Sequence, residues 1–317
     1  VTASLLAIAL YLVGRAVVSP RPYVAIAFGL AVAAATYVRP QNILFAPLLP
    51  LASVLHGGPV RPRLRRAALV AAIATTTCLA AIAPWTLRNC DKMGMCALVS
   101  VNGGWNLHIG TNQNAGGTWA PIEVPVACRT VWDEAAKDAC FGREAKSEIA
   151  THPGAWLALV PKKLWVTFEY FGAGPWYLHA ANPQAFQQSV KMGFAAAEIV
   201  FHRLLIAAAI GALLRRLAEV VAPGRSGLYR WGPWALGAVC AASAAVGTLL
   251  SGILAALVAF SPRLRKNVGP AVPLAATVIL ATAAVHAVYF GAGRYGLVVI
   301  PALVLLLVEA VDPAFDR

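Results

Sequence analysis

The segment 101–121 combines side-chain amides, glycines and tryptophans in a pattern that suits a neutral, hydroxyl-rich ligand such as a sugar. It reads VNGGWNLHIGTNQNAGGTWAP. Asn102, Asn106 and Asn112 can each donate and accept hydrogen bonds, and the two tryptophans offer flat apolar faces. A turn-rich loop that packs on the rim of a membrane would use the same residues, so both interpretations stay open.

The elements around this segment are dominated by apolar residues. Of the 317 residues, 59% are hydrophobic and 12% are charged, and the mean hydropathy is +0.69. A soluble domain usually has about 25% charged residues. This composition argues against a disordered, collagen-like or water-soluble protein and favours one that spans a membrane.

The net positive charge of the chain fits a membrane protein. The formal net charge is +13, from 26 Lys and Arg against 13 Asp and Glu. On a soluble chain this balance would suggest a nucleic-acid partner, but here the basic residues flank apolar runs. Short cytoplasmic loops of membrane proteins collect Lys and Arg. We therefore expect membrane lipids as partners and no nucleic acid.

The apolar runs predict a helical membrane protein. A membrane-spanning helix needs about 20 residues. The candidate spans are 1–17, 23–38, 41–56, 68–87, 194–214, 233–260, 271–290 and 296–311. The run 233–260 has basic residues on both flanks, so its topology stays open. We predict an all-α polytopic membrane protein with about seven to eight transmembrane helices and one external loop domain of mixed structure.

The distribution of charge orients these spans. The segment 57–67 contains four arginines and is predicted to be cytoplasmic, together with Arg15 and Arg21. Counting crossings from there places Arg39 and the polar segment 88–155 outside. The segment 156–172 mixes aromatic residues with lysines, which is typical of the headgroup level, and it is expected to form an interfacial or re-entrant helix.

Three parts follow from this topology. Residues 1–87 are predicted to form a four-helix transmembrane part, residues 88–193 the external loop domain, and residues 194–317 a C-terminal transmembrane part. The first residue, Val1, already belongs to an apolar run. The chain is therefore expected to be the C-terminal portion of a longer protein.

Four of the six cysteines lie in the expected external loop, where thiols can oxidise. Four cysteines allow three pairings, and the most local one joins Cys90 to Cys96 and Cys128 to Cys140. Free thiols and a metal site are the alternatives. Spacings of six and twelve residues do not match the paired C-x₂-C motifs of structural zinc sites.

Four segments resemble bacterial GT-C glycosyltransferases of the dolichyl-phosphate-mannose–protein mannosyltransferase-like group, glycosyltransferase family 39 and its relatives. They are PWTLRN (84–89), NGGWNLHIGTNQNAGG (102–117), YVRPQNILFAPLLPL (37–51) and FGAGRYGLVVIPAL (290–303). Two positions depart from the pattern of the group. Gln41 replaces an acidic residue, and Gly296 stands where a second arginine is frequent.

The resemblance implies a fold, a reaction and a location. Members of this group transfer a sugar from a polyprenyl-phosphate donor to a lipid, glycan or protein acceptor on the outer face of the membrane. The resemblance thus implies a bacterial inner-membrane protein with a periplasmic or extracellular loop at 88–193. Its cofactor would be none or a divalent cation.

The resemblance also implies site residues. Arg294, Tyr295 and Arg39 are the expected contacts of the donor phosphate, unless the arginines only snorkel to headgroups. The sugar or acceptor path is expected to be lined by Asn102, Asn106, His108 and Asn112.

The catalytic residue is not among these candidates. The group places its catalytic Asp in a loop after its first helix, so that residue is expected upstream of Val1. Two other functions are compatible with external arginines and an apolar groove: a transporter or flippase for a lipid-linked glycan, and a non-catalytic scaffold of envelope assembly.

Overall fold

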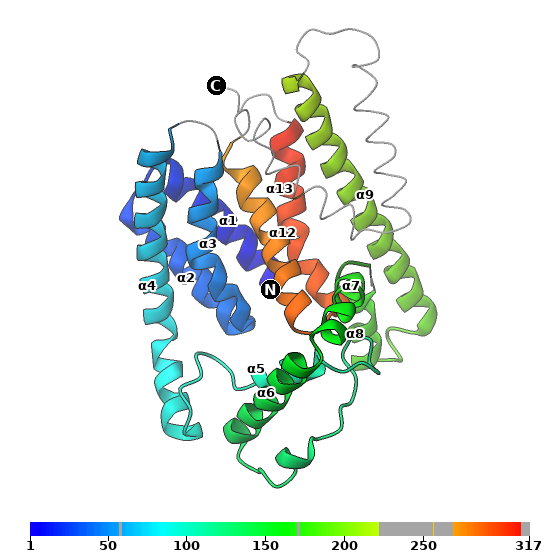
Figure 1. Cartoon of the computed structure of the whole chain (residues 1–317). Coiled ribbons are helices and arrows are strands. Elements are labelled where there is room, and N and C mark those ends of the chain that lie inside the picture. Colours follow the sequence, from blue (N-terminus) through cyan, green and yellow to red (C-terminus); the bar gives the residue numbers. More distant parts are fainter. Residues whose placement is uncertain (57–58, 170–171, 222–255, 257–268, 312–317) are drawn as a thin grey trace.

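The computed structural model describes residues 1–56, 59–169, 172–221, 256 and 269–311 (Figure 1). The α-helices are α1 (Thr2–Val18), α2 (Pro22–Val38), α3 (Phe45–Ala52), α4 (Val60–Met93), α5 (Gly103–Ile109), α6 (Glu134–Thr151), α7 (Pro153–Glu169), α8 (Ala173–Ala181), α9 (Gln188–Val221), α12 (Ala271–Val288) and α13 (Ile300–Val311). Shorter 3₁₀ segments are η1 (Pro40–Leu44), η2 (Ser53–Leu55), η3 (Val126–Cys128) and η5 (Gly293–Val299).

The described residues form helices joined by turns and contain no β-strand, which confirms the all-α class. The only β-type pairing recorded among them is an isolated parallel bridge between Thr118 and Gly291. The loop segment expected to have mixed structure is therefore helical and irregular where it is described. The expected span 233–260 lies outside the described residues, apart from Ala256.

Three of the described helices are long and apolar enough to cross a membrane: Val60–Met93, Gln188–Arg216 and Ala271–Val288. Three more apolar helical segments, Thr2–Val18, Pro22–Val38 and Pro40–Leu55, are shorter. These findings support a membrane protein, although the described residues do not clearly give the seven to eight spans expected. Prolines are one physical reason why α2 is short. Pro22 is its first residue, and Pro40 follows the residue that caps its end.

Small residues let the first helices approach one another closely. Gly29 of α2 faces α4, where a Cβ atom would lie 2.7 Å from the carbonyl oxygen of Ala74. The hydroxyl of Tyr37 donates a hydrogen bond to the carbonyl of Ala81 on α4. Outside this contact, large apolar side chains such as Leu30 and Leu69 are exposed, as expected for helices that face lipid.

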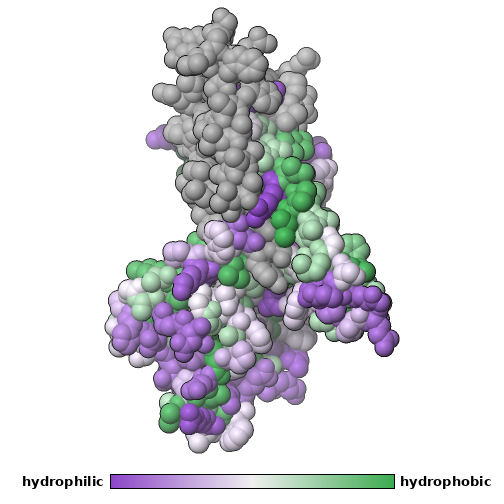
Figure 2. All heavy atoms as spheres, turned by 90° about the vertical axis from the view of Figure 1, so that its right-hand side faces the viewer, coloured by the Kyte–Doolittle hydropathy of each residue, from purple (hydrophilic) through white to green (hydrophobic). Residues whose placement is uncertain are grey.

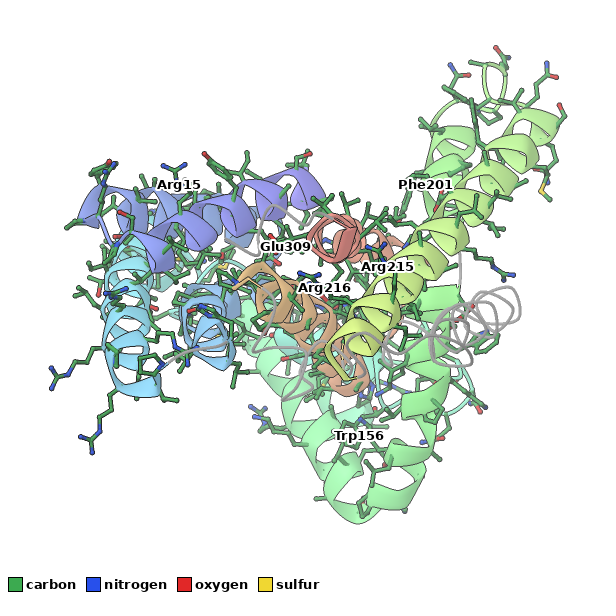
Figure 3. The ribbon with its side chains drawn as sticks, turned by 90° about the horizontal axis from the view of Figure 1, so that it is seen from above. Arg15, Trp156, Phe201, Arg215, Arg216 and Glu309 are labelled. Carbon is green, nitrogen blue, oxygen red and sulfur yellow. A yellow bond between two sulfur atoms is a disulfide. The ribbon has the colours of Figure 1, made fainter. Side chains whose placement is uncertain are left out.

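The helices run between two chemically different ends of the molecule. The last turn of α1, which contains Arg15, and the last part of α9, which contains Arg215 and Arg216, lie toward the same, upper end (Figure 1). Figure 3 looks down on the molecule from that side and labels these three arginines. Helix α9 ends there and α12 begins there (Figure 1). The opposite end carries α5 and α6, and Figure 2 shows many hydrophilic side chains on that lower part of the molecule.

Two disulfides and a side-chain cap organise the end of the molecule that carries α5 and α6, which we call the loop end. Cys90 is bonded to Cys96 and Cys128 to Cys140, which confirms the local pairing. The carboxylate of Asp138 on α6 accepts hydrogen bonds from the amides of Gly104 (3.0 Å) and Trp105 (2.7 Å). Because these amides have no partner within α5, Asp138 fixes the start of α5 on α6.

The helix expected at 156–172 is α7, but one of its lysines does not lie at the surface. The side chain of Lys163 is fully buried. Its Nζ donates to the carbonyls of Ala287 and Val288 at 3.2 Å each, at the C-terminal end of α12. The expectation of headgroup-facing lysines therefore fails for Lys163, because helix-end carbonyls attract a cation.

Candidate functional site

Arg39 is held at a sharp corner between α2 and η1. Pro40 disfavours the helical conformation for the preceding residue, and Arg39 is extended, with φ −147° and ψ 110°. The side-chain amide of Asn42 donates to the carbonyl of Ala35 at 2.8 Å, which caps the end of α2. From this corner the Arg39 side chain reaches the ring of Tyr295 on η5.

Arg294 and Tyr295 lie on η5, which packs directly on α7. A Cβ atom at Gly291 would lie 2.0 Å from the carbonyl oxygen of Lys163, and one at Gly296 would lie 2.3 Å from that of Thr167. Glycine is therefore needed at both positions. This close approach explains why a glycine stands at position 296.

Two arginines from distant parts of the chain converge on the ring of Tyr295. The guanidinium carbon of Arg39 lies 4.4 Å from the ring centroid, and that of Arg294 lies 5.1 Å from it. Arg294 also donates to the hydroxyl of Tyr295 at 3.1 Å and to the hydroxyl of Tyr177. The imidazole of His286 stacks on the same ring, with centroids 4.0 Å apart.

This arginine–tyrosine group lines a cavity of about 780 Å³. The cavity lies at the loop end of the molecule, between the ends of α2 and α12, the start of α5, α8 and η5. Its lining residues are Val1, Thr2, Val38, Arg39, Pro40, Gln41, Ile43, Leu44, Asn102, Gly103, Asn106, Tyr177, Val285, His286, Tyr289, Phe290, Arg294 and Tyr295.

The lining is cationic and contains no Asp or Glu. Among the residues that the structure describes, neither Arg39 nor Arg294 forms an ion pair with a carboxylate. Burial, together with the neighbouring Arg294, lowers the pKa of Arg39 from its ordinary value, yet an arginine stays charged at neutral pH. Two charged guanidiniums without a counter-ion make this cavity suited to an anion with several oxygens.

The predicted site residues fall into two groups. Arg39, Arg294 and Tyr295 lie together, and Asn102 and Asn106 line the same cavity. Asn102 is the N-cap residue of α5 and Asn106 lies within this helix, which Asp138 holds on α6.

His108 and Asn112 lie away from this cavity. His108 stacks on Phe141 of α6 with centroids 5.6 Å apart, and burial lowers the pKa of its imidazole. The side-chain oxygen of Asn112 accepts from the amides of Asn114 and Ala115 at 3.0 and 3.4 Å. These contacts organise the loop itself.

Sequence reasoning did not select Tyr177, His286 or Gln41 as site residues, although all three line the cavity. For His286 a signal existed, since a histidine within an apolar helix is often functional. Tyr177 gave no such signal, because it lies in a run of aromatic residues typical of a membrane interface.

A second cavity of about 410 Å³ adjoins the first. Its walls are mainly aromatic and small, from Trp119, Trp176, Ala173, Ala292 and Gly293. Tyr177 and Arg294 line both cavities.

Within the described residues, no group of three or more His, Cys, Asp or Glu side chains could hold a metal ion. Three acidic side chains of the loop have local contacts: Asp133 caps α6, Asp138 caps α5 and Asp91 contacts Lys92. Comparison with protein-family models, with curated proteins and with solved structures finds no match to this chain.

Proposed function

We propose that the chain is the membrane portion of a glycosyltransferase that uses a polyprenyl-phosphate-linked sugar donor at the outer face of the membrane. One observation carries this proposal. Arg39 and Arg294 converge on Tyr295 in a large cavity whose lining has no acidic residue. The resemblance of the segments at 37–51, 102–117 and 290–303 supports the same function.

In the proposed reaction, an acceptor hydroxyl attacks the anomeric carbon of the sugar. A bond forms between the acceptor oxygen and this carbon, and the bond from the carbon to the phosphate oxygen breaks. The polyprenyl phosphate leaves with the electron pair, and the two arginines stabilise its negative charge. The acceptor proton passes to a carboxylate base, which the lining of this cavity does not supply.

Asn102 and Asn106 have the chemistry to bind the hydroxyl groups of the sugar, and they lie in the same lining as the arginines. The proposed orientation puts the basic end of the molecule, with Arg15 and Arg215, in the cytoplasm. The loop end then faces the periplasm or the exterior, where lipid-linked sugars are used.

Binding of a polyprenyl phosphate tests the proposal. In protein reconstituted in nanodiscs, Arg39→Ala and Arg294→Ala should each weaken binding at least about ten-fold, because a hydrogen bond to a charged group contributes about 1.5–3 kcal/mol. In the full-length protein both variants should also abolish transfer from a radiolabelled polyprenyl-phosphate sugar.

Arg88→Ala is the matched control. Arg88 belongs to the same end of the molecule and rests on Trp85 at 4.7 Å, but it does not line the cavity. Its replacement should leave binding unchanged. Equal binding by all three alanine variants would refute the phosphate site, and phosphate-dependent binding without transfer in the full-length protein would favour a transporter.

A further inference from the structure

The ring of Tyr295 is the shared contact of the two arginines in the proposed phosphate site. The guanidinium carbons of Arg39 and Arg294 lie 4.4 and 5.1 Å from its centroid. Two positive charges repel one another, whereas the face of an aromatic ring attracts a cation. The position of this ring therefore decides where both guanidiniums lie and how they meet an anion.

The segment that carries Tyr295 gives the ring little support of its own. Tyr295 belongs to η5, and the hydrogen bonds of a 3₁₀ segment have poorer geometry than those of an α-helix. Glycines stand two residues before it and one residue after it, at positions 293 and 296, and they offer no side chain that could pack against the ring. Other elements must therefore orient the ring.

His286 of α12 provides a flat surface against which the Tyr295 ring packs. The two rings are nearly parallel, with an interplanar angle of 16° and centroids 4.0 Å apart. Phe290 meets the same tyrosine ring at a steeper angle of 63°, with centroids 5.8 Å apart. Contacts between aromatic rings favour particular orientations beyond the area that they bury. His286 and Phe290 together therefore fix the plane of the Tyr295 ring.

The imidazole of His286 is itself held in place. His286 is 5% exposed, and its Nδ1 lies 3.0 Å from the carbonyl oxygen of Phe290. A carbonyl oxygen can only accept a hydrogen bond, so Nδ1 carries the hydrogen and donates it. This bond lies beside the end of α12, whose last residue is Val288. The Tyr295 ring thus stacks on an imidazole that a hydrogen bond has already oriented.

The surroundings of His286 allow its ring to be exchanged. His286 lines the large cavity and also a small one of about 20 Å³, which it shares with Arg39, Asn42 and Tyr295 among others. The small cavity gives space for the larger ring of a phenylalanine. A leucine fills a similar volume without presenting a flat face, so the two substitutions separate stacking from filling of space.

We propose that His286 is a positioning residue, which holds the two arginines ready for an anion through the Tyr295 ring and does not itself contact the phosphate. This inference rests on the proposed function and specifies how its anion site is preorganised. Each side chain that must be ordered at the moment of binding lowers affinity about two- to ten-fold. Loss of the stacked imidazole leaves at least the Tyr295 side chain to be ordered.

The test measures binding of farnesyl phosphate to protein in nanodiscs, after subtraction of binding to empty nanodiscs. Farnesol is the companion probe that lacks the anion. His286→Leu should weaken binding of farnesyl phosphate about two- to ten-fold and leave farnesol binding unchanged. His286→Phe should retain the wild-type affinity for both probes, because its ring can stack on Tyr295. Equal losses in the two variants would overturn the proposal, since the imidazole would then contact the ligand directly.

A double-mutant cycle tests whether His286 acts through Tyr295. In a Tyr295→Ala background, His286→Leu should cause no further loss of affinity for farnesyl phosphate, because the ring that His286 orients is already absent. Losses that add would show that His286 acts on the anion by another route, which contradicts the proposal.

His179→Ala is the control. Nδ1 of His179 also lies beside a backbone carbonyl, that of Phe186 at 2.6 Å, but His179 lines none of these cavities. Its replacement should leave binding of farnesyl phosphate unchanged. Thermal unfolding of every variant shows that only folded proteins are compared.

The outcomes separate this inference from the function on which it rests. If Arg294→Ala weakens binding of farnesyl phosphate while His286→Leu binds it like the wild type, the arginines are positioned without His286 and only this inference fails. If the wild type binds farnesyl phosphate no more tightly than farnesol, the proposed function fails as well.

Discussion

The role of a charged residue in this structure depends on the groups that surround its charge. Lys163 and Arg39 are both cations without a carboxylate partner among the described residues. Lys163 is fully buried, and its donors are directed to the carbonyls that end α12. Arg39 lines a cavity instead. Lys163 therefore stabilises the packing of α7 on α12, whereas the guanidinium of Arg39 remains available to a ligand.

The burial of Lys163 leads to a prediction about how the free energy of unfolding depends on pH. Burial lowers the pKa of its ammonium from 10.5 to about 8. Between these values the unfolded chain binds more protons than the folded one, so the free energy of unfolding should rise with pH. Thermal unfolding of detergent-solubilised protein between pH 7 and 10 measures this slope.

Lys163→Met removes the titrating group and should flatten that slope relative to the wild type. Lys162→Met is the control, because Lys162 neighbours it on α7 but is exposed. It should keep the wild-type slope. The same slope in all three proteins would show that Lys163 does not contribute a shifted titration.

At the scale of elements, glycines decide how closely the loop end packs on the helices. Gly104 allows α5 to lie against α6, where a Cβ atom would come within 1.9 Å of the carbonyl oxygen of Asp138. This contact holds Asn102 and Asn106 in the cavity lining. Gly291 and Gly296 have the same effect where η5 lies on α7.

Gly104→Ala should therefore destabilise the protein by about 1–3 kcal/mol through overpacking and displace α5 from the cavity. A lower unfolding temperature and weaker binding of a polyprenyl-phosphate sugar are the expected measurements. Gly154→Ala is the control, since no atom lies within 4 Å of the Cβ position there and Gly154, on α7, does not line the cavity. A stable Gly104→Ala protein with unchanged binding would contradict this role for the α5–α6 contact.

At the scale of the whole molecule, charge and chemistry are divided between two ends. The arginines of α1, of the start of α4 and of the end of α9 belong to one end. The disulfides, the amide-rich loop and both cavities belong to the other. A membrane protein with this division is expected to keep its basic end in the cytoplasm.

Cysteine substitutions test this orientation in intact cells. Lys146 on α6 and Arg65 on α4 are both exposed and belong to opposite ends. A membrane-impermeant maleimide should modify Lys146→Cys but should reach Arg65→Cys only after the membrane is permeabilised. The reverse pattern would invert the topology and remove the proposed glycosyltransferase function.

The sequence by itself determined the features that depend on neighbouring residues. Apolar runs predicted helices that the structure contains at 2–18, 22–38 and 271–288, since apolar helices form wherever backbone hydrogen bonds must be satisfied away from water. The local disulfide pairing was predictable for a similar reason, because close cysteines pair with a short loop. The role of Arg39, Arg294 and Tyr295 as phosphate contacts stays a prediction.

Only the tertiary structure decided which polar residues meet. Arg39 and Arg294 are 255 positions apart in the sequence, and it is the Pro40 corner and the approach of η5 to α7 that bring both to Tyr295. The same folding turned His108 toward Phe141 and buried Lys163 under α12. Periodicity places a residue on an element, but close contacts between elements decide whether its charge meets a carbonyl, a ring or an open cavity.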